Sequence, residues 1–129
     1  MPLVFWLLTQ YFRNNDNAMM KVQGIFRVTS HGAEVRKFET HMSQENYIAL
    51  QREQDPHIVS NYFKRVLREM KEPLIPYSLY YKFAQLSDIS TEEGKVYRIQ
   101  ELVAKMDLQR QRTLHFIIKF FEEVVFYET

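Results

Sequence analysis

Residues 55–76 read DPHIVSNYFKRVLREMKEPLIP, and this stretch decides the fold class. Asp55 suits a helix N-cap, because its carboxylate can accept backbone N–H groups, and Pro56 suits the first helical position. Apolar residues then recur with the helical period: Ile58, Val59, Tyr62, Phe63, Val66, Leu67 and Met70. Proline disfavours helix at the residue before it. We therefore expect a helix over residues 56–70 and an extended link over residues 72–76.

A second, polar stripe runs along the same expected helix. It consists of Asn61, Lys64, Arg68 and Lys71. Such a stripe is usually a solvated face opposite the core, and the pattern alone favours that interpretation. Aligned cations could instead receive an acidic partner.

The remaining pattern is also helical. We expect helices over residues 3–13, 33–42, 78–86, 90–106 and 107–127, a loop over 14–17 and an extended connector over 24–30, with 43–54 undecided. Residues 90–93, Ser-Thr-Glu-Glu, match a capping box, and Asp107 is placed to cap the last helix. Tyr77, Tyr80, Tyr81 and Phe83 are expected in the core. Helices joined by short connectors predict an all-α, single-domain bundle over residues 1–129.

The composition argues against several classes of function. The 129 residues carry 17 basic and 16 acidic side chains, a net charge of +1, which argues against a general nucleic-acid binder. The absence of cysteine excludes thiolate nucleophiles and cysteine-based zinc sites. The three glycines form no glycine-rich phosphate loop, and the four histidines share no metal-binding spacing. No segment of the sequence is apolar enough for a membrane span.

Arg27 is the first candidate functional residue. It lies in residues 24–30, GIFRVTS, where apolar neighbours would fix the backbone by burial. A guanidinium on a fixed loop suits the stabilisation of phosphate charge, because it is planar and always protonated. The competing interpretation, favoured by spacing alone, is an arginine that pairs with a nearby carboxylate. A self-contained active site is not indicated.

Both candidates lie in motifs that resemble the Rho GTPase-activating (RhoGAP) domain. Residues 24–29, GIFRVT, resemble its G-I-F-R-V-S element, and residues 57–76 resemble its H-x-V-A-x-x-L-K-x-[FY]-L-R-E-L-P-E-P-L-[IL]-P stretch. Residues 1–13 are similar to the helix before the finger loop. Thr113-Leu114 and the helix after them resemble the later T-L-x-x-L-L segment. The resemblance covers nearly all of the chain.

The resemblance implies a role for each site residue. Arg27 would be the catalytic arginine finger, Lys64 would contact the GTPase near its nucleotide, and Arg68 would brace the finger loop through its backbone. The other implied site residues are Asn61, Lys71 and Pro76 at the GTPase-binding surface, and Gly24 and Phe26 in the shaping of the loop. No metal site is implied.

The chain also departs from the family pattern. Ser30 stands where the family has a small glycine, and Met70-Lys71 replaces Leu-Pro before Glu72. The sequence ends at Thr129 without the N-K-M-x-x-x-N-L-A-x-x-[FL]-x-P motif. We therefore expect a partial domain that lacks the C-terminal helices. Exposure of the bundle surface would then favour a homodimer, with residues 116–127 taking part.

The resemblance implies a GTPase-activating module for a Rho-family small GTPase. Such a protein is not an enzyme by itself, because it supplies an arginine in trans, while Mg²⁺ and GTP belong to the partner and no cofactor is needed. The alternative is a RhoGAP-like binding or scaffold module with weak or no activity. We expect a cytoplasmic protein with no nucleic-acid partner and no direct membrane insertion. Any membrane recruitment would come through the GTPase.

Overall fold

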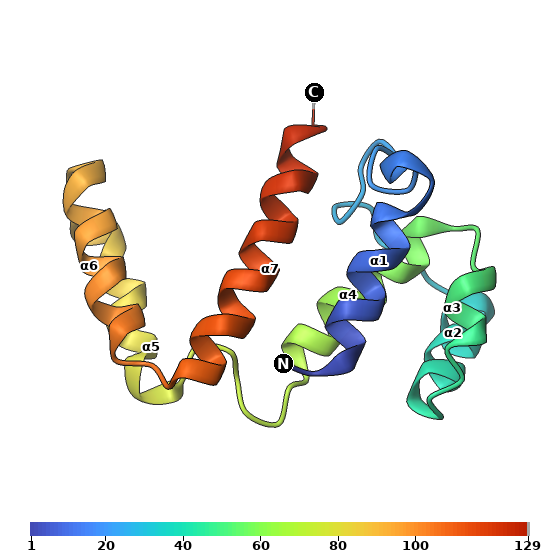
Figure 1. The fold of residues 1–129 in the computed structure, drawn as a ribbon, viewed down its shortest axis with the longest axis horizontal. Helices are drawn as coiled ribbons and strands as arrows, with labels where there is room; N and C mark the ends of the chain where they lie inside the picture. The colour runs from blue at the N-terminus through green and yellow to red at the C-terminus, as the bar shows by residue number, and fades with distance from the viewer. Residues whose placement is uncertain (129) are drawn as a thin grey trace.

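The computed structural model describes residues 1–128 and is built from helices (Figure 1). Its α-helices are α1 (Leu3–Asn17), α2 (Ala33–Ser43), α3 (Ile48–Arg52), α4 (Pro56–Arg68), α5 (Tyr77–Ala84), α6 (Glu92–Ala104) and α7 (Leu108–Phe126). A short 3-10 helix, Gln85–Asp88, follows α5. No strand occurs within residues 1–128, and the all-α prediction is confirmed.

The main core lies where α1, α4 and α7 meet. α1 packs against α4 and α3, and α2 packs against α3 and α4. The core residues are Phe5, Leu8, Tyr11, Phe12, Met20, Phe38, Met42, Leu50, Ile58, Val59, Phe63, Ile117 and Phe120. Phe63 of α4 stacks on Phe120 of α7 with ring centroids 5.4 Å apart. The broad apolar face expected on α4 is therefore the centre of the domain.

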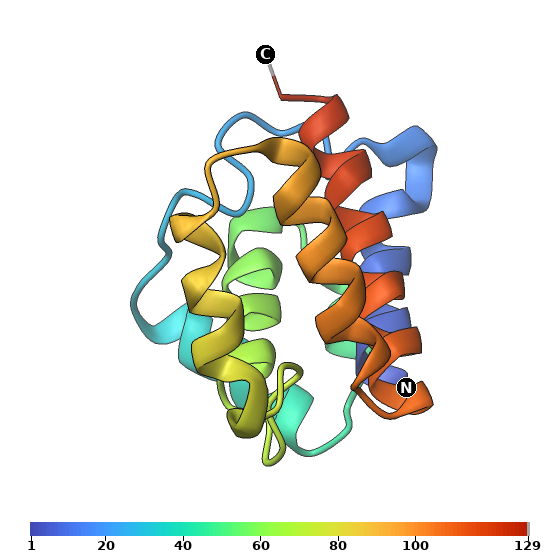
Figure 2. The same cartoon turned by 90° about the vertical axis from the view of Figure 1, so that its left-hand side faces the viewer.

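The α5–α6 hairpin stands apart from this core. Figure 1 shows α6 and α7 diverging from their junction, and Figure 2 shows α5 and α6 in front of α4 and α7. The hairpin has a small cluster of its own, formed by Leu79, Leu102 and Met106. Phe83 and Leu114 pack against that cluster. The bundle is thus compact on one side and open on the other.

Helix ends follow local chemistry. Asp55 accepts the N–H of His57 at 2.9 Å, and Asp107 accepts the N–H of Arg110 at 3.1 Å, which confirms both expected N-caps. The hydroxyl of Thr91 caps α6 by accepting the N–H of Gly94 at 3.1 Å. The expected box had placed Ser90 in that role. The cap is one residue later because Thr91 holds the extended backbone that an N-cap requires.

The end of α1 is a change of backbone conformation. Asn14 is extended, and the three residues after it, Asn15, Asp16 and Asn17, all have positive φ. Asparagine and aspartate tolerate this left-handed region better than other side-chain-bearing residues. The right-handed helix therefore ends at Arg13, and the loop expected over residues 14–17 is present.

The structure settles one undecided stretch and corrects one expectation. Residues 43–54 contain α3, which is only five residues long and buries a single side chain, Leu50. Tyr77, Tyr80 and Tyr81 are exposed rather than in the core. They lie on α5, whose only fully buried side chain is Leu79, because the hairpin has little other surface to pack against. Among residues 1–128, no helix is long and apolar enough to cross a bilayer.

Candidate functional site

The candidate loop is a series of tight turns. The sequence predicted an extended connector over residues 24–30. In the structure the N–H groups of Arg27 and Val28 both donate to the carbonyl oxygen of Gly24 at 2.9 Å. The N–H of Ile25 donates to the carbonyl of Val22 at 3.1 Å. Backbone polar groups that turn away from water must find partners, and here the loop supplies its own.

Gly24 makes the turn sterically possible. Its φ is +76°, a conformation that side-chain-bearing residues rarely adopt. A Cβ atom added at Gly24 would lie 2.7 Å from Cγ2 of Val28 and 3.6 Å from Nη2 of Arg27. The missing side chain therefore leaves room for the residues at the tip of the loop.

Phe26 anchors the loop in the core. Its ring lies among four other rings, with centroid distances of 5.1 Å to Phe12, 5.6 Å to Phe63, 5.8 Å to Phe120 and 5.0 Å to Phe121. Its backbone φ is +64°, which is unusual for a bulky residue. Such a conformation persists only where the surroundings over-determine it, and the aromatic cluster does so here.

Arg27 follows this anchor and is exposed. Its side chain makes no hydrogen bond or ion pair within residues 1–128. The loop thus holds the backbone of Arg27 while leaving its guanidinium open to solvent. The competing interpretation, a structural arginine paired with a local carboxylate, is not what the geometry shows.

Two side chains of α4 hold the carbonyl groups on either side of Arg27. The ammonium of Lys64 donates to the carbonyl oxygen of Phe26 at 2.7 Å. The side-chain amide of Asn61 donates to the carbonyl oxygen of Val28 at 2.9 Å and to that of His57 at 2.6 Å. Asn61 and Lys64 are three residues apart, so they project from the same face of the helix.

The braces in this structure therefore come from Asn61 and Lys64 and not from Arg68. Arg68 is exposed at the last helical position of α4, and its side chain makes no hydrogen bond with the part of the chain that the structure describes. The cause is its position one turn beyond Lys64, farther along a helix that leads away from the loop. Lys64, which the resemblance places near the nucleotide of the GTPase, is bonded to the loop in this structure.

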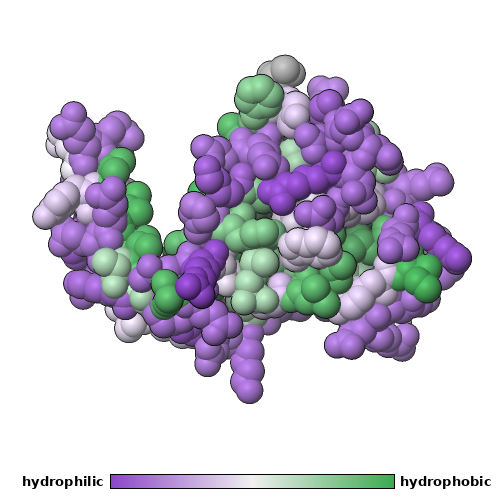
Figure 3. All heavy atoms as spheres, in the orientation of Figure 1, coloured by the Kyte–Doolittle hydropathy of each residue, from purple (hydrophilic) through white to green (hydrophobic). Residues whose placement is uncertain are grey.

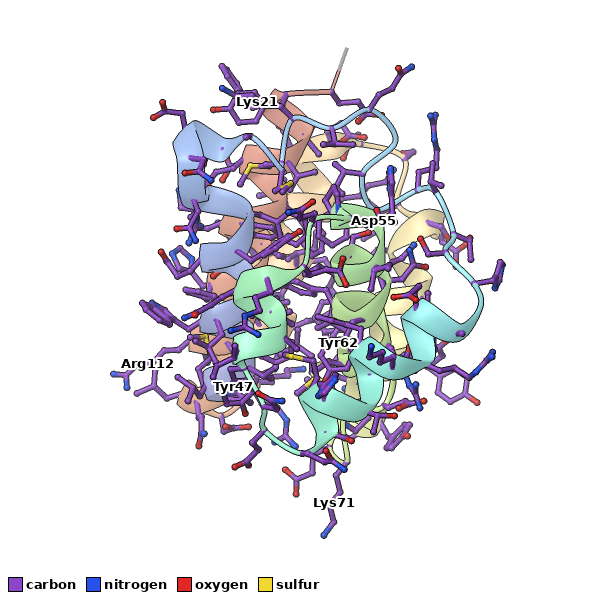
Figure 4. The ribbon with its side chains drawn as sticks, turned by 90° about the vertical axis from the view of Figure 1, so that its right-hand side faces the viewer. Lys21, Tyr47, Asp55, Tyr62, Lys71 and Arg112 are labelled. Carbon is purple, nitrogen blue, oxygen red and sulfur yellow. The ribbon has the colours of Figure 1, made fainter. Side chains whose placement is uncertain are left out.

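The other expected residues lie farther away. Figure 4 shows Lys71 projecting from the end of the molecule opposite to Lys21, which precedes the loop. Lys71 is exposed, and Pro76 is half-buried at the start of α5. The expected polar stripe is thus divided. Asn61 and Lys64 contact the arginine loop, whereas Arg68 at the end of α4 and Lys71 beyond it are exposed.

The charge next to the loop is positive. Arg65 lies on another side of α4, where it pairs with Glu39 and Glu69. Its hydrogen bond to Glu69 is the largest influence that raises its pKa, followed by the charge of Glu39. Arg27 and Lys64 carry no such carboxylate partner among residues 1–128. No group of three histidine or acidic side chains in the described residues is arranged to hold a metal ion.

This arrangement can stabilise negative charge on another molecule. A guanidinium is suited to phosphate oxygens because its donors are planar and its charge is permanent. The loop is held before any ligand arrives, so little of its ordering has to occur on binding. The sequence indicated that apolar neighbours of Arg27 would fix the loop, with Phe26 among the loop-shaping residues. It did not indicate the rings that Phe26 meets, those at positions 12, 63, 120 and 121, because they come together only in the tertiary structure.

Comparison with known families and proteins gives a consistent result. The model of the RhoGAP domain matches residues 2–129. Mouse Rho GTPase-activating protein 30 is 32% identical over 101 residues, which cover 76% of this chain and 9% of that protein. The WW domain-containing protein tag-325 of Caenorhabditis elegans is 26% identical over 105 residues, covering 81% of this chain and 12% of that protein.

A solved structure has the same fold. The crystal structure of human Rho GTPase activating protein 15 superposes with a TM-score of 0.76 at 23% sequence identity. The match covers 95% of this chain and 59% of that one. The chain therefore spans a small part of the length of the curated relatives and more than half of the solved chain.

Proposed function

Since this chain belongs to the RhoGAP domain family, we propose that it binds a Rho-family small GTPase and accelerates GTP hydrolysis by inserting Arg27 into the partner's active site. The single observation that carries the proposal is the geometry of Arg27. Its backbone is fixed on both sides, and its guanidinium is exposed and unpaired within residues 1–128. A trans-acting arginine requires this combination, because it must be held in place and must also be free to leave its own surface.

The mechanism follows from charge. During hydrolysis, negative charge develops on the transferring phosphoryl group of GTP, which the partner binds together with Mg²⁺. Arg27 would place a permanent positive charge and two donors beside those oxygens. An arginine supplied in trans accelerates hydrolysis by roughly 10³ to 10⁵, or about 4–7 kcal/mol of the barrier.

The rest of the site would orient this charge. Phe26 and Gly24 set the path of the backbone, and Asn61 and Lys64 hold the carbonyls that flank Arg27. Arg68 and Lys71 would meet the acidic surface of the GTPase and aid encounter more than affinity. Pro76 would shape the partner-facing groove between α4 and the hairpin.

The test is single-turnover GTP hydrolysis by a panel of Rho-family GTPases, with the wild-type chain and Arg27→Ala compared side by side. We expect acceleration by the wild-type chain that is lost in Arg27→Ala. Arg52→Ala is the matched control, because Arg52 is an exposed arginine on α3, away from the loop. It should leave the acceleration unchanged.

Binding has to be measured in the same samples. Wild-type binding without acceleration would contradict the proposal and identify a RhoGAP-like scaffold instead. Equal loss of acceleration in Arg27→Ala and Arg52→Ala would also contradict it, because the effect would then be one of general surface charge. Loss of acceleration with retained binding in Arg27→Ala alone is the expected pattern.

A further inference from the structure

The α5–α6 hairpin is joined to the rest of the molecule by two short segments. The first segment, residues 69–76, leads from α4 to α5, and the second, residues 105–107, leads from α6 to α7. Within the hairpin, α5, the 3-10 helix and α6 pack on one another. Figure 3 shows the surface deeply hollowed between the hairpin and the rest of the molecule. The direction in which the hairpin projects therefore depends mainly on how these two segments are held.

The first segment has little support from its own backbone. Residues 71–75 make no hydrogen bond between backbone groups within residues 1–128, so no turn or helix holds them. Pro73 and Pro76 restrict φ, but each of them also removes an N–H donor. Leu74 packs against the main core, and α5 begins three residues later. The backbone around Leu74 thus needs a further contact to fix the base of the hairpin.

Arg110 makes that contact and bonds to both segments at once. Its Nη2 donates to the carboxylate of Glu72 at 2.8 Å, and its Nε donates to the carbonyl oxygen of Pro73 at 3.4 Å. Its Nη1 donates to the carboxylate of Asp107 at 2.7 Å. A guanidinium suits this position because its donors point in several directions within one rigid plane. The two ends of the hairpin are thereby joined through a single side chain.

The position of Arg110 is itself fixed. Its backbone N–H donates to the carboxylate of Asp107 at 3.1 Å, so the carboxylate that caps α7 also orients the guanidinium. The side-chain amide of Gln111 donates to the carbonyl oxygen of Met106 at 2.7 Å, which ties the second segment to α7 once more. Farther along, Phe120 anchors α7 in the main core. Arg110 therefore acts from a fixed helix on a first segment that has little support of its own.

The three bonds of the guanidinium act as a set. An exposed ion pair alone contributes little to stability, and the side chain of Glu72 is 78% exposed. The side chain of Arg110 is only 28% exposed, and each of its bonds restricts the freedom that the other two would otherwise have to overcome. We therefore expect the network to fix the geometry of the hairpin more than it raises the free energy of unfolding.

We propose that Arg110 is a positioning residue that holds the two segments together and so sets the direction in which the α5–α6 hairpin projects from α4 and α7. The consequence for a partner rests on the function proposed above. The first segment ends at Pro76, on the surface that would face the GTPase, and α5 follows directly. A hairpin fixed by Arg110 presents this surface before the GTPase arrives, so less ordering has to occur on binding.

The first test uses the chain alone and measures the distance between two spin labels. The chain has no cysteine, so labels can be placed at Gln51→Cys on α3 and Gln100→Cys on α6, which are both exposed. We expect a narrow distance distribution in the wild-type background. Arg110→Met, which removes all the donors, should broaden it. Glu72→Gln should broaden it less, and should add nothing in the Arg110→Met background because the two residues share one bond.

Arg112→Met is the matched control. Arg112 lies two positions farther along α7, is exposed, and makes no side-chain hydrogen bond or ion pair within residues 1–128. Figure 4 shows it pointing outward at the edge of the molecule. It should leave the distribution narrow, and circular dichroism should show equal helix content in all variants. A narrow distribution in Arg110→Met, a broad one in wild type, or equal broadening in Arg112→Met would overturn the proposal.

The second test measures the response of the partner. GTP hydrolysis by a Rho-family GTPase is followed at rising concentrations of the chain, which gives the saturating rate and the concentration for half-maximal activation separately. Arg110→Met should raise that concentration about tenfold, because the hairpin then has to be ordered on binding, and should leave the saturating rate unchanged. Arg27→Ala should instead lower the saturating rate.

The two tests separate this proposal from the proposed function. A lower saturating rate in Arg110→Met at an unchanged half-maximal concentration would overturn the positioning role. Absence of activation by the wild-type chain would contradict the function proposed above and not the role of Arg110 in the hairpin, which the label distances decide by themselves.

Discussion

Lys64 donates a hydrogen bond of 2.7 Å from its ammonium to the carbonyl oxygen of Phe26, the residue immediately before the exposed arginine. This bond joins the middle of α4 to the tip of the loop across 38 positions of sequence. Because the donor is charged and half-buried, the bond is of the stronger kind. The position of Arg27 is thereby tied to the helix that carries the centre of the core.

Removal of the Lys64 ammonium should reduce activity by loosening the loop. A hydrogen bond from a charged group contributes about 1.5–3 kcal/mol, so Lys64→Met should lower GTPase activation by about 10- to 100-fold. The methionine keeps the apolar stem. Single-turnover hydrolysis is the measurement, and Lys37→Met on α2 is the control, because Lys37 is exposed and away from the loop. Unchanged activity in Lys64→Met would contradict the role of this bond.

Alanine substitutions at Phe26 and Arg27 should differ strongly in their effect on stability. Phe26→Ala removes a ring that contacts four others and should lower the free energy of unfolding by about 3 kcal/mol. Arg27→Ala removes an exposed side chain and should change it by less than about 0.5 kcal/mol. Urea unfolding followed by circular dichroism measures both values. A large loss of stability in Arg27→Ala would show that its side chain has a structural partner.

Gly24 and Gly32 form a natural pair for testing the turn. Both have positive φ, but a Cβ at Gly24 would meet Val28 at 2.7 Å, whereas nothing lies within 4 Å of one at Gly32. Each alanine substitution should lower the free energy of unfolding by about 1–3 kcal/mol, because alanine strains a backbone with positive φ. Gly24→Ala should cost more, and it alone should reduce GTPase activation. Thermal unfolding and single-turnover hydrolysis of both variants check this, and equal effects would exclude the contact with Val28 as the cause.

Asp107 should make α7 sensitive to acid. Its side-chain hydrogen bond to Arg110 is the main influence that lowers the pKa of this carboxyl, and the bond to the backbone of Arg110 adds to it. A folded-state pKa below the unfolded value means that the stabilisation is fully present above about pH 5 and is lost as the pH falls through the folded pKa.

The melting temperature should reveal this effect when wild type and Asp107→Asn are compared across pH. We expect wild type to be more stable at neutral pH and the difference to vanish in acid. Asp88→Asn is the control, since Asp88 makes no side-chain hydrogen bond within residues 1–128. A difference that stays constant with pH would show that the charge of Asp107 has no part in capping.

The sequence predicted most of the helices because their signals are local. Asp55, Pro56 and Asp107 mark helix starts by hydrogen bonds or fixed φ within a few residues. The turns around Gly24 were missed because their positive φ values leave no periodic pattern. The exposure of Tyr77, Tyr80 and Tyr81 was missed because aromatic residues usually pack, and only the arrangement of the hairpin shows that nothing covers them.

The candidate site was predictable in its residues and less so in its contacts. Arg27, Lys64 and Asn61 were selected from motifs, but the bonds that Lys64 and Asn61 make were not. They depend on where α4 passes the loop, which is set by the packing of Phe26 against Phe63 and Phe120. Long-range contacts of this kind have no signature in sequence spacing.

The carbonyl oxygen of Gly24, which accepts two hydrogen bonds, should slow amide hydrogen exchange in the loop. Amide hydrogens in surface loops normally exchange with solvent through small local openings. The amide hydrogens of Arg27 and Val28 are both donated to the carbonyl oxygen of Gly24. Phe26, the residue before them, packs in the aromatic core. Exchange of these two amide hydrogens therefore requires an opening that also disrupts the packing of Phe26 in the core. The loop should exchange on the timescale of global opening, as slowly as the middle of α4, although Arg27 reaches into solvent.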